Sequence, residues 1–292
     1  YHHRDSNIRK TGLLFALFFT IIIGFGYFLS YYFNNPGILY LAVFFSIFMS
    51  FLSYWFSDKL VLSMAGARPV TRASARELYN IVENLAITAG LPAPKIYIIN
   101  DPSPNAFATG RNPQNSVVAV TAGLLNILDR SELEGVLAHE LSHIGNWDML
   151  LSTVAVILVG FVSLASDLFL RSMFFGMHRD SDNRGGNGLM LAAGLVLMIL
   201  APIAAVLIQL AISRRREFLA DASGALLTRY PEGLASALKK ISQAPAVRSA
   251  KNTTAHLWFD DPFGPRPKTP WFHKLFMTHP PVEERVKALL GR

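Results

Sequence analysis

Four long apolar segments constrain this chain more than any other feature of its sequence. They are residues 13–33, 38–56, 149–170 and 189–212. A helix needs about 20 apolar residues to cross the hydrocarbon core of a bilayer, and each segment approaches or exceeds that length. The first segment is too long for a signal-peptide core and shows no clear cleavage site, so we expect it to be retained. The sequence therefore predicts an α-helical integral membrane protein with four transmembrane helices.

The composition agrees with a membrane protein and narrows the chemistry available to the chain. Hydrophobic residues make up 51% of the 292 residues and charged residues 16%, which is more apolar than a typical soluble protein. The chain contains no cysteine, which excludes disulfides, thiolate metal ligands and a cysteine nucleophile. Any transition metal must therefore be held by histidine and carboxylate side chains. The net charge of +7 is typical of basic residues flanking membrane spans, and no nucleic-acid partner is expected.

Basic residues indicate how the predicted spans are oriented. Clusters lie before the first span, after the second and after the fourth: Arg4, Arg9 and Lys10; Lys59, Arg68, Arg72 and Arg76; Arg214, Arg215 and Arg216. Four spans place all three clusters on one side, which the positive-inside rule assigns to the cytoplasm. Arg171, Arg179 and Arg184, in the loop 171–188, run against this orientation. We expect a multi-pass protein of the bacterial inner membrane with both termini in the cytoplasm.

The spans divide the chain into four parts. Residues 1–56 hold two transmembrane helices, 57–148 the first half of a cytoplasmic domain, 149–212 two central transmembrane helices with their outer loop, and 213–292 the second half. Short β-branched runs at 95–100 and 116–121 predict strands. Capping-box patterns at 74–77 and 131–134 predict the starts of two helices, the first of which should end near Gly90. Helices are also predicted over 213–228, from Pro231, and over 281–290.

The second of these helices carries the sequence His139-Glu140-Leu141-Ser142-His143. Residues four apart lie on one face of a helix, so His139 and His143 could bind one metal ion. Glu140 would lie beside that ion, where its carboxylate can take a proton from water. Zinc suits the pattern best, because a catalytic zinc site has three protein ligands and one open position. A third ligand is therefore needed.

Glu217 is the candidate for this ligand. It lies on the helix that follows the fourth span, and Asp221 is one turn further along the same face. Asp221 would accept a hydrogen bond from the far nitrogen of a ligating histidine and fix its tautomer. Alternatively, Glu217 is an exposed acid that pairs with Arg214 or Arg216.

Four sequence stretches together resemble the HtpX family, membrane-embedded zinc proteases related to the Ste24 CAAX proteases. They are AHELSHIGNWD, REFLADA, NAFATG and MTHPPVEER, and the resemblance covers nearly the whole chain. It implies an α+β, mainly helical, gluzincin-type protease domain with one zinc ion on His139, His143 and Glu217, and with Glu140 as the catalytic base. It also implies the degradation of misfolded or surplus membrane proteins under stress.

The resemblance implies further site residues. His279 would lie near the zinc and stabilise the oxyanion of the transition state, with Arg285 close to the ligands; alternatively, the segment of His279 only caps the last helix. Asn105, Ala106 and Phe107 would form a strand edge that binds an extended substrate, or else an ordinary structural strand.

We therefore expect a zinc endopeptidase whose partners are the lipid bilayer and unfolded or misfolded membrane proteins. Two other hypotheses remain open at this point. The first is a non-catalytic membrane scaffold or chaperone-like factor with a structural metal, although Glu140 is present. The second is CAAX-type processing of prenylated peptides, which needs a larger intramembrane chamber than four spans can build.

Overall fold

The computed structural model describes residues 2–32, 34–161, 213–248, 250, 257–262 and 279–291. The stretch from His139 to His143 is called the motif below. The elements before it are α1 (His2–Tyr32), α2 (Pro36–Trp55), α3 (Ser57–Met64), β1 (Ala67–Pro69), α4 (Arg76–Ala89), β2 (Lys95–Ile99), β3 (Ala106–Gly110), η1 (Pro113–Asn115), β4 (Ser116–Thr121) and α5 (Ala122–Ile127). The motif helix and later elements are α6 (Arg130–Gly145), the helix Asp148–Phe161, α9 (Arg214–Thr228), α10 (Pro231–Ser242) and α12 (Val282–Leu290).

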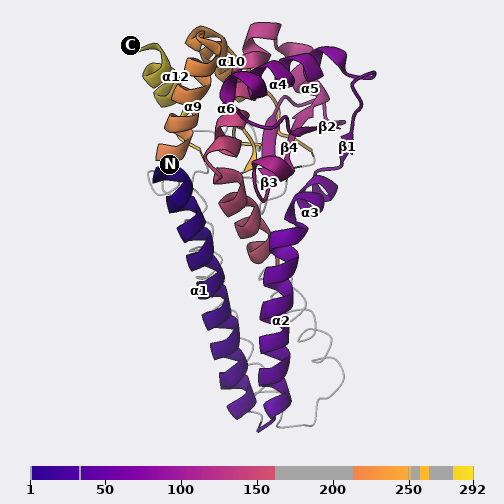
Figure 1. Cartoon of the computed structure of the whole chain (residues 1–292), viewed down its shortest axis with the longest axis vertical. Coiled ribbons are helices and arrows are strands. Elements are labelled where there is room, and N and C mark those ends of the chain that lie inside the picture. The colour runs from indigo at the N-terminus through magenta and orange to yellow at the C-terminus, as the bar shows by residue number, and fades with distance from the viewer. Residues whose placement is uncertain are drawn as a thin grey trace.

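The helices α1 and α2 form an antiparallel pair that projects from one end of a mixed α/β domain (Figure 1). Within the described residues, Asp5–Tyr31 and Pro36–Trp55 are long and apolar enough to span a membrane. Their side chains are largely exposed, as expected for lipid contact, and the tight connection starts α2 with Asn35 accepting a hydrogen bond from the Gly37 amide. The first two predicted spans are therefore present as helices, and the free end of α1 and the end of α2 both lie at the domain.

The third predicted span begins as the helix Asp148–Phe161, which is bent by 82° relative to α6. It packs between α1 and α2 in a second apolar core, in which Leu14 and Phe18 of α1 meet Leu151 and Val154. If α6 and this helix count as one broken span, the described residues hold up to three spans. The rest of the third predicted span, the loop 171–188 and the fourth predicted span, 189–212, lie outside the described residues.

A four-stranded sheet in the order β1-β2-β4-β3 forms the centre of the domain. β4 is parallel to β2 and antiparallel to β3, and the short β1 pairs antiparallel to β2. The central strand β4 is buried on both faces, with Val118 and Val120 in the main core beneath α4 and α6. Val117 and Ala119 face the opposite side, toward α3 and the helix Asp148–Phe161. β3 is left at the edge of the sheet.

Two glycines allow the helices around α6 to approach closely. A Cβ atom at Gly135 would lie 2.9 Å from the Leu234 backbone of α10, and one at Gly224 of α9 would lie 3.0 Å from the His139 amide nitrogen. Real Cβ atoms are rarely found at such distances, so larger residues here would force the helices apart. The close packing places α9 beside α6 (Figure 1), with Gly224 against the backbone of His139.

Candidate active site

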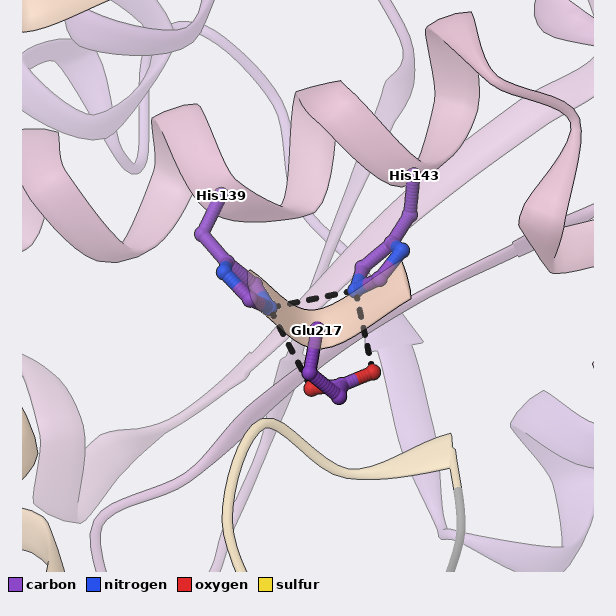
Figure 2. A group of neighbouring side chains, drawn as sticks. All are labelled: His139, His143 and Glu217. Carbon is purple, nitrogen blue, oxygen red and sulfur yellow. Dashed lines mark hydrogen bonds and ion pairs between the residues drawn. The ribbon is translucent and has the colours of Figure 1, made fainter. Parts of the chain in front are cut away.

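The side chains of His139, His143 and Glu217 converge on one point between α6 and α9 (Figure 2). The two Nε2 atoms are 3.1 Å apart, and the carboxylate oxygens of Glu217 lie 3.8 Å from Nε2 of His139 and 3.6 Å from Nε2 of His143. Nitrogen and oxygen ligands lie about 2.0–2.2 Å from zinc, so a tetrahedral site places its ligand atoms about 3.3 Å apart. The observed separations are close to that value, and the three residues therefore fit a zinc ion.

Each histidine is oriented through its other ring nitrogen by an aspartate. Nδ1 of His139 lies 2.8 Å from Oδ1 of Asp221, and Nδ1 of His143 lies 3.0 Å from Oδ2 of Asp148. A proton on Nδ1 leaves Nε2 with its lone pair, which is the tautomer that a ligating histidine needs. Asp221, singled out from its position one turn after Glu217, faces His139. Asp148 was not singled out by the sequence analysis, because only the bend after α6 brings it back to His143.

Arg285 neutralises Asp221 in the interior. Its side chain is fully buried and makes two hydrogen bonds to the Asp221 carboxylate, 2.6 Å from Nη2 and 2.8 Å from Nε. It also donates to the carbonyl oxygen of Phe259, whose ring packs on His139. Burial alone would raise the pKa of Asp221, but the Arg285 charge and hydrogen bonds lower it to about 2. The aspartate therefore stays ionised and keeps accepting the proton of His139.

Glu140 lies beside the ligand cluster and lines the same small cavity as Ala108 and His279. Its side chain is buried, which raises the pKa of the carboxyl to about 7, although the neighbouring His143 and a backbone hydrogen bond from Ala108 act in the opposite direction. A buried carboxyl of this kind can hold or release a proton near neutral pH, as an acid–base catalyst must.

His279 lies against the third predicted ligand. Its Nδ1 is 3.1 Å from Oε2 of Glu217, and its Nε2 is buried with no hydrogen-bond partner among the described residues. The carboxylate can only accept, so Nδ1 donates to it. Burial would raise the pKa of Glu217, but the charge and hydrogen bond of His279 hold it well below its usual value, so the carboxylate of Glu217 stays ionised.

Asn105, Ala106 and Phe107 contact another part of the chain itself. The Asn105 amide donates to the carbonyl of Asp260 and accepts from its N–H, and the Phe259 N–H donates to the carbonyl of Ala106. The Phe107 ring packs edge-on against Trp258. These three residues therefore hold residues 258–260 along β3, and their role toward a substrate stays a prediction.

Comparison with known proteins places the chain in a family. The model of peptidase family M48 matches residues 72–292. A protease HtpX homolog of Caldanaerobacter subterraneus is 46% identical over 99% of this chain and 96% of its own length. A protease HtpX homolog of Pyrococcus furiosus is 47% identical over 96% of this chain and 94% of its own length.

A solved structure shares the fold. The Ste24p of S. mikatae aligns over 99% of this chain and 66% of its own length, with a TM-score of 0.52 and 21% sequence identity. The M48 match covers both halves of the candidate site, α6 with its two histidines and α9 with Glu217. The chain belongs to peptidase family M48, a family of zinc metallopeptidases, and is a membrane protease of the HtpX type.

Proposed function

We propose that this metallopeptidase is an endopeptidase that holds one zinc ion per chain on His139, His143 and Glu217, and that it degrades misfolded or surplus membrane proteins. The observation that carries the ligand assignment is the convergence of two Nε2 atoms and a carboxylate from separate helices. Each Nδ1 faces an aspartate. That arrangement leaves the ligand lone pairs directed at one point.

In this proposal Glu140 is the general base. When bound, zinc supplies a Lewis acid that polarises the scissile carbonyl and makes water easier to deprotonate. Glu140 takes the proton of the attacking water and later delivers it to the leaving amine. Burial raises the pKa of Glu140 to about 7, and a bound metal cation would lower it, because a neighbouring positive charge favours the carboxylate form.

His279 completes the proposed site as a donor to the oxyanion. Its Nδ1 faces the carboxylate of Glu217, so Nε2 can donate only when the ring carries protons on both nitrogens. The buried Nε2 of His279 has no competing hydrogen-bond partner among the described residues. A donor held in place before the reaction stabilises negative charge without reorganisation.

An extended substrate would approach along β3, at one edge of the sheet, because an edge strand can pair with a peptide backbone. Asn105 and Ala106 already bond residues 259 and 260. Ala108, which lines the cavity next to Glu140, is therefore the part of the edge where we propose that the scissile segment binds.

The ligand and base assignments can be tested with purified full-length protein in detergent without chelator. Zinc per chain and cleavage of casein would be measured for wild type, Glu140→Gln and the control Glu134→Gln. Glu134 lies on the same helix but pairs on the surface with Arg130. We expect about one zinc in all three and cleavage by wild type and the control only. Full cleavage by Glu140→Gln would rule out this residue as the base.

The proposed substrate class needs a separate comparison. A model membrane protein and a destabilised variant of it would be reconstituted with the protease in vesicles. We expect the destabilised variant to be cleaved faster, because a cleft must admit an extended backbone on both sides of the cut. Equal rates for the two forms would contradict a role in quality control.

We also propose that the domain and both termini face the cytoplasm. Arg9 and Lys10 lie near the start of α1 and Lys59 lies on α3, and both of these parts of the chain are at the domain end of the two spans (Figure 1). The chain has no native cysteine, so single cysteines can report its topology. Gln243→Cys in the domain should resist an impermeant thiol reagent added outside cells, whereas Asn34→Cys should react. The reverse pattern would overturn the orientation.

A further inference from the structure

Asn7 connects the first membrane-spanning helix to the candidate active site. It lies near the start of α1 and is only 3% exposed, although its neighbours Ser6 and Ile8 are exposed. Its side-chain amide donates to Oδ1 of Asp148 at 2.6 Å and to the carbonyl oxygen of Asn146 at 3.0 Å. Both bonds join parts of the chain that are distant in sequence, and both end on the turn that follows α6.

The turn that Asn7 binds has a backbone conformation that needs support. Trp147, between the two residues that Asn7 contacts, has φ of +61°, which is unusual for a residue other than glycine. Such left-handed residues persist when the surrounding structure holds them. This turn also bends the chain by 82° between α6 and the helix Asp148–Phe161. Asn7 therefore bridges the two sides of the bend.

The bend determines where Asp148 lies. One oxygen of its carboxylate, Oδ2, lies 3.0 Å from Nδ1 of His143, while the other, Oδ1, accepts from Asn7. The Arg216 side chain approaches the same Oδ1, with Nε at 3.7 Å. With both oxygens engaged, the carboxylate cannot rotate freely, and the plane of the His143 ring is fixed in turn. In this series of hydrogen bonds, Asn7 is the residue that belongs to α1.

We propose that Asn7 is a positioning residue of the metal site, and that α1 is thereby a working part of the active site in addition to a membrane anchor. This inference rests on the proposed zinc ligands. Asn7 acts through Asp148: it holds the turn and the carboxylate, and the carboxylate orients His143 for the metal. Loss of a partner that orients a metal ligand typically weakens metal binding 10- to 100-fold.

The test measures zinc affinity by competition with a chromophoric chelator, using full-length protein in detergent. We expect Asn7→Leu to bind zinc about tenfold more weakly than wild type, and Asp148→Asn to lose as much or more. Thr20→Ala is the matched control, because Thr20 lies on an exposed face of the same helix and its hydroxyl donates to the Ala16 carbonyl of that helix. Asn7→Ser offers a smaller side chain if leucine prevents folding.

The double variant separates positioning from simple support of the fold. If Asn7 acts through Asp148, Asn7→Leu combined with Asp148→Asn binds zinc no more weakly than Asp148→Asn alone. Additive losses, or wild-type affinity in both Asn7 variants, would overturn the inference. His143→Ala reports on the proposed function separately: unchanged zinc affinity in that variant would show that the ligand assignment itself is wrong, whatever Asn7 does.

Discussion

Replacing Arg285 by methionine should be among the most destabilising single changes in the domain. The guanidinium is fully buried and bonds both oxygens of Asp221, which is itself only 2% exposed. Removing one partner of a buried ion pair leaves the other charge without compensation and typically costs about 3–5 kcal/mol. A domain of 150–250 residues changes its melting temperature by about 2–4 °C per kcal/mol, so we expect a loss of roughly 6–20 °C.

The assay is thermal unfolding of full-length protein in detergent, with the surface pair Arg130–Glu134 as the control. That pair has a nitrogen–oxygen distance of 2.9 Å, similar to the buried pair, but Arg130 is 62% exposed. Exposed pairs often contribute nothing measurable, so Arg130→Met should leave the melting temperature unchanged.

The double variant Arg285→Met with Asp221→Leu shows whether the uncompensated charge is the cause. It removes both charges and should melt above Arg285→Met alone, although His139 then loses its own partner. Equal losses from Arg285→Met and Arg130→Met would refute the reasoning from burial. So would a double variant that loses the sum of its two single variants.

Three further outcomes are expected. Gly224→Ala should lower protease activity and zinc affinity, because the new Cβ would lie 3.0 Å from the His139 amide nitrogen. The control Gly145→Ala should be tolerated, because its Cβ meets Leu91 at an ordinary 3.5 Å. Unchanged kinetics in both variants would contradict the close packing at Gly224. Burial would raise the pKa of Glu132, but hydrogen bonds from Lys240 and Ser236 lower it below 4.5. The ionised carboxylate therefore stabilises the fold above about pH 4.5, and this contribution disappears as the pH falls through the lowered pKa. Glu132→Gln should therefore melt at a lower temperature at pH 7 and show a smaller loss on acidification than wild type, and parallel pH profiles would argue against this. Asn105→Ala should release residues 258–260 from β3 and expose the buried Trp258. An aqueous quencher of tryptophan fluorescence would detect this exposure. Equal quenching in Asn105→Ala and wild type would mean that other contacts hold the segment.

Local sequence patterns predicted most of the elements of the domain. The β-branched runs became β2 and β4, Pro231 starts α10, and α4 ends where Gly90 takes a left-handed conformation. The starts of two helices were predicted less well. The prediction of a capping box at Ser74 was wrong, because its hydroxyl bonds back to Thr71 instead.

The helix that carries the motif begins earlier than its pattern suggested. Its capping box is formed by Asp129 and Glu132, and Ser131 lies inside the helix, where its hydroxyl donates to Asp129. Several Ser, Asp and Glu residues follow one another here, and each could form part of a cap. The apolar pattern likewise did not mark where α1 starts, since the apolar segment begins at residue 13 and the helix begins at His2.

The candidate site was predictable where its chemistry is local to one helix. The spacing of His139 and His143 fixes a common face, and Asp221 lies one turn from Glu217. Asp148 and Asn7 could not be found in this way. Their contribution depends on a left-handed Trp147 and on the docking of a membrane helix, and neither leaves a periodic signal in the sequence.

The cavity among the site residues has consequences for the timing of catalysis. Its volume is about 40 Å³, with Trp258 and Phe259 in its wall. A water molecule needs about 10–15 Å³ of such space, and an extended peptide needs about 3.3 Å of length for every residue along with room for its side chains. Among the described residues, this space is therefore large enough for water but smaller than an extended peptide needs. We expect peptide binding to require this wall to move, and the frequency of that movement would then limit the rate at which any protein, including a second copy of the enzyme, is cut.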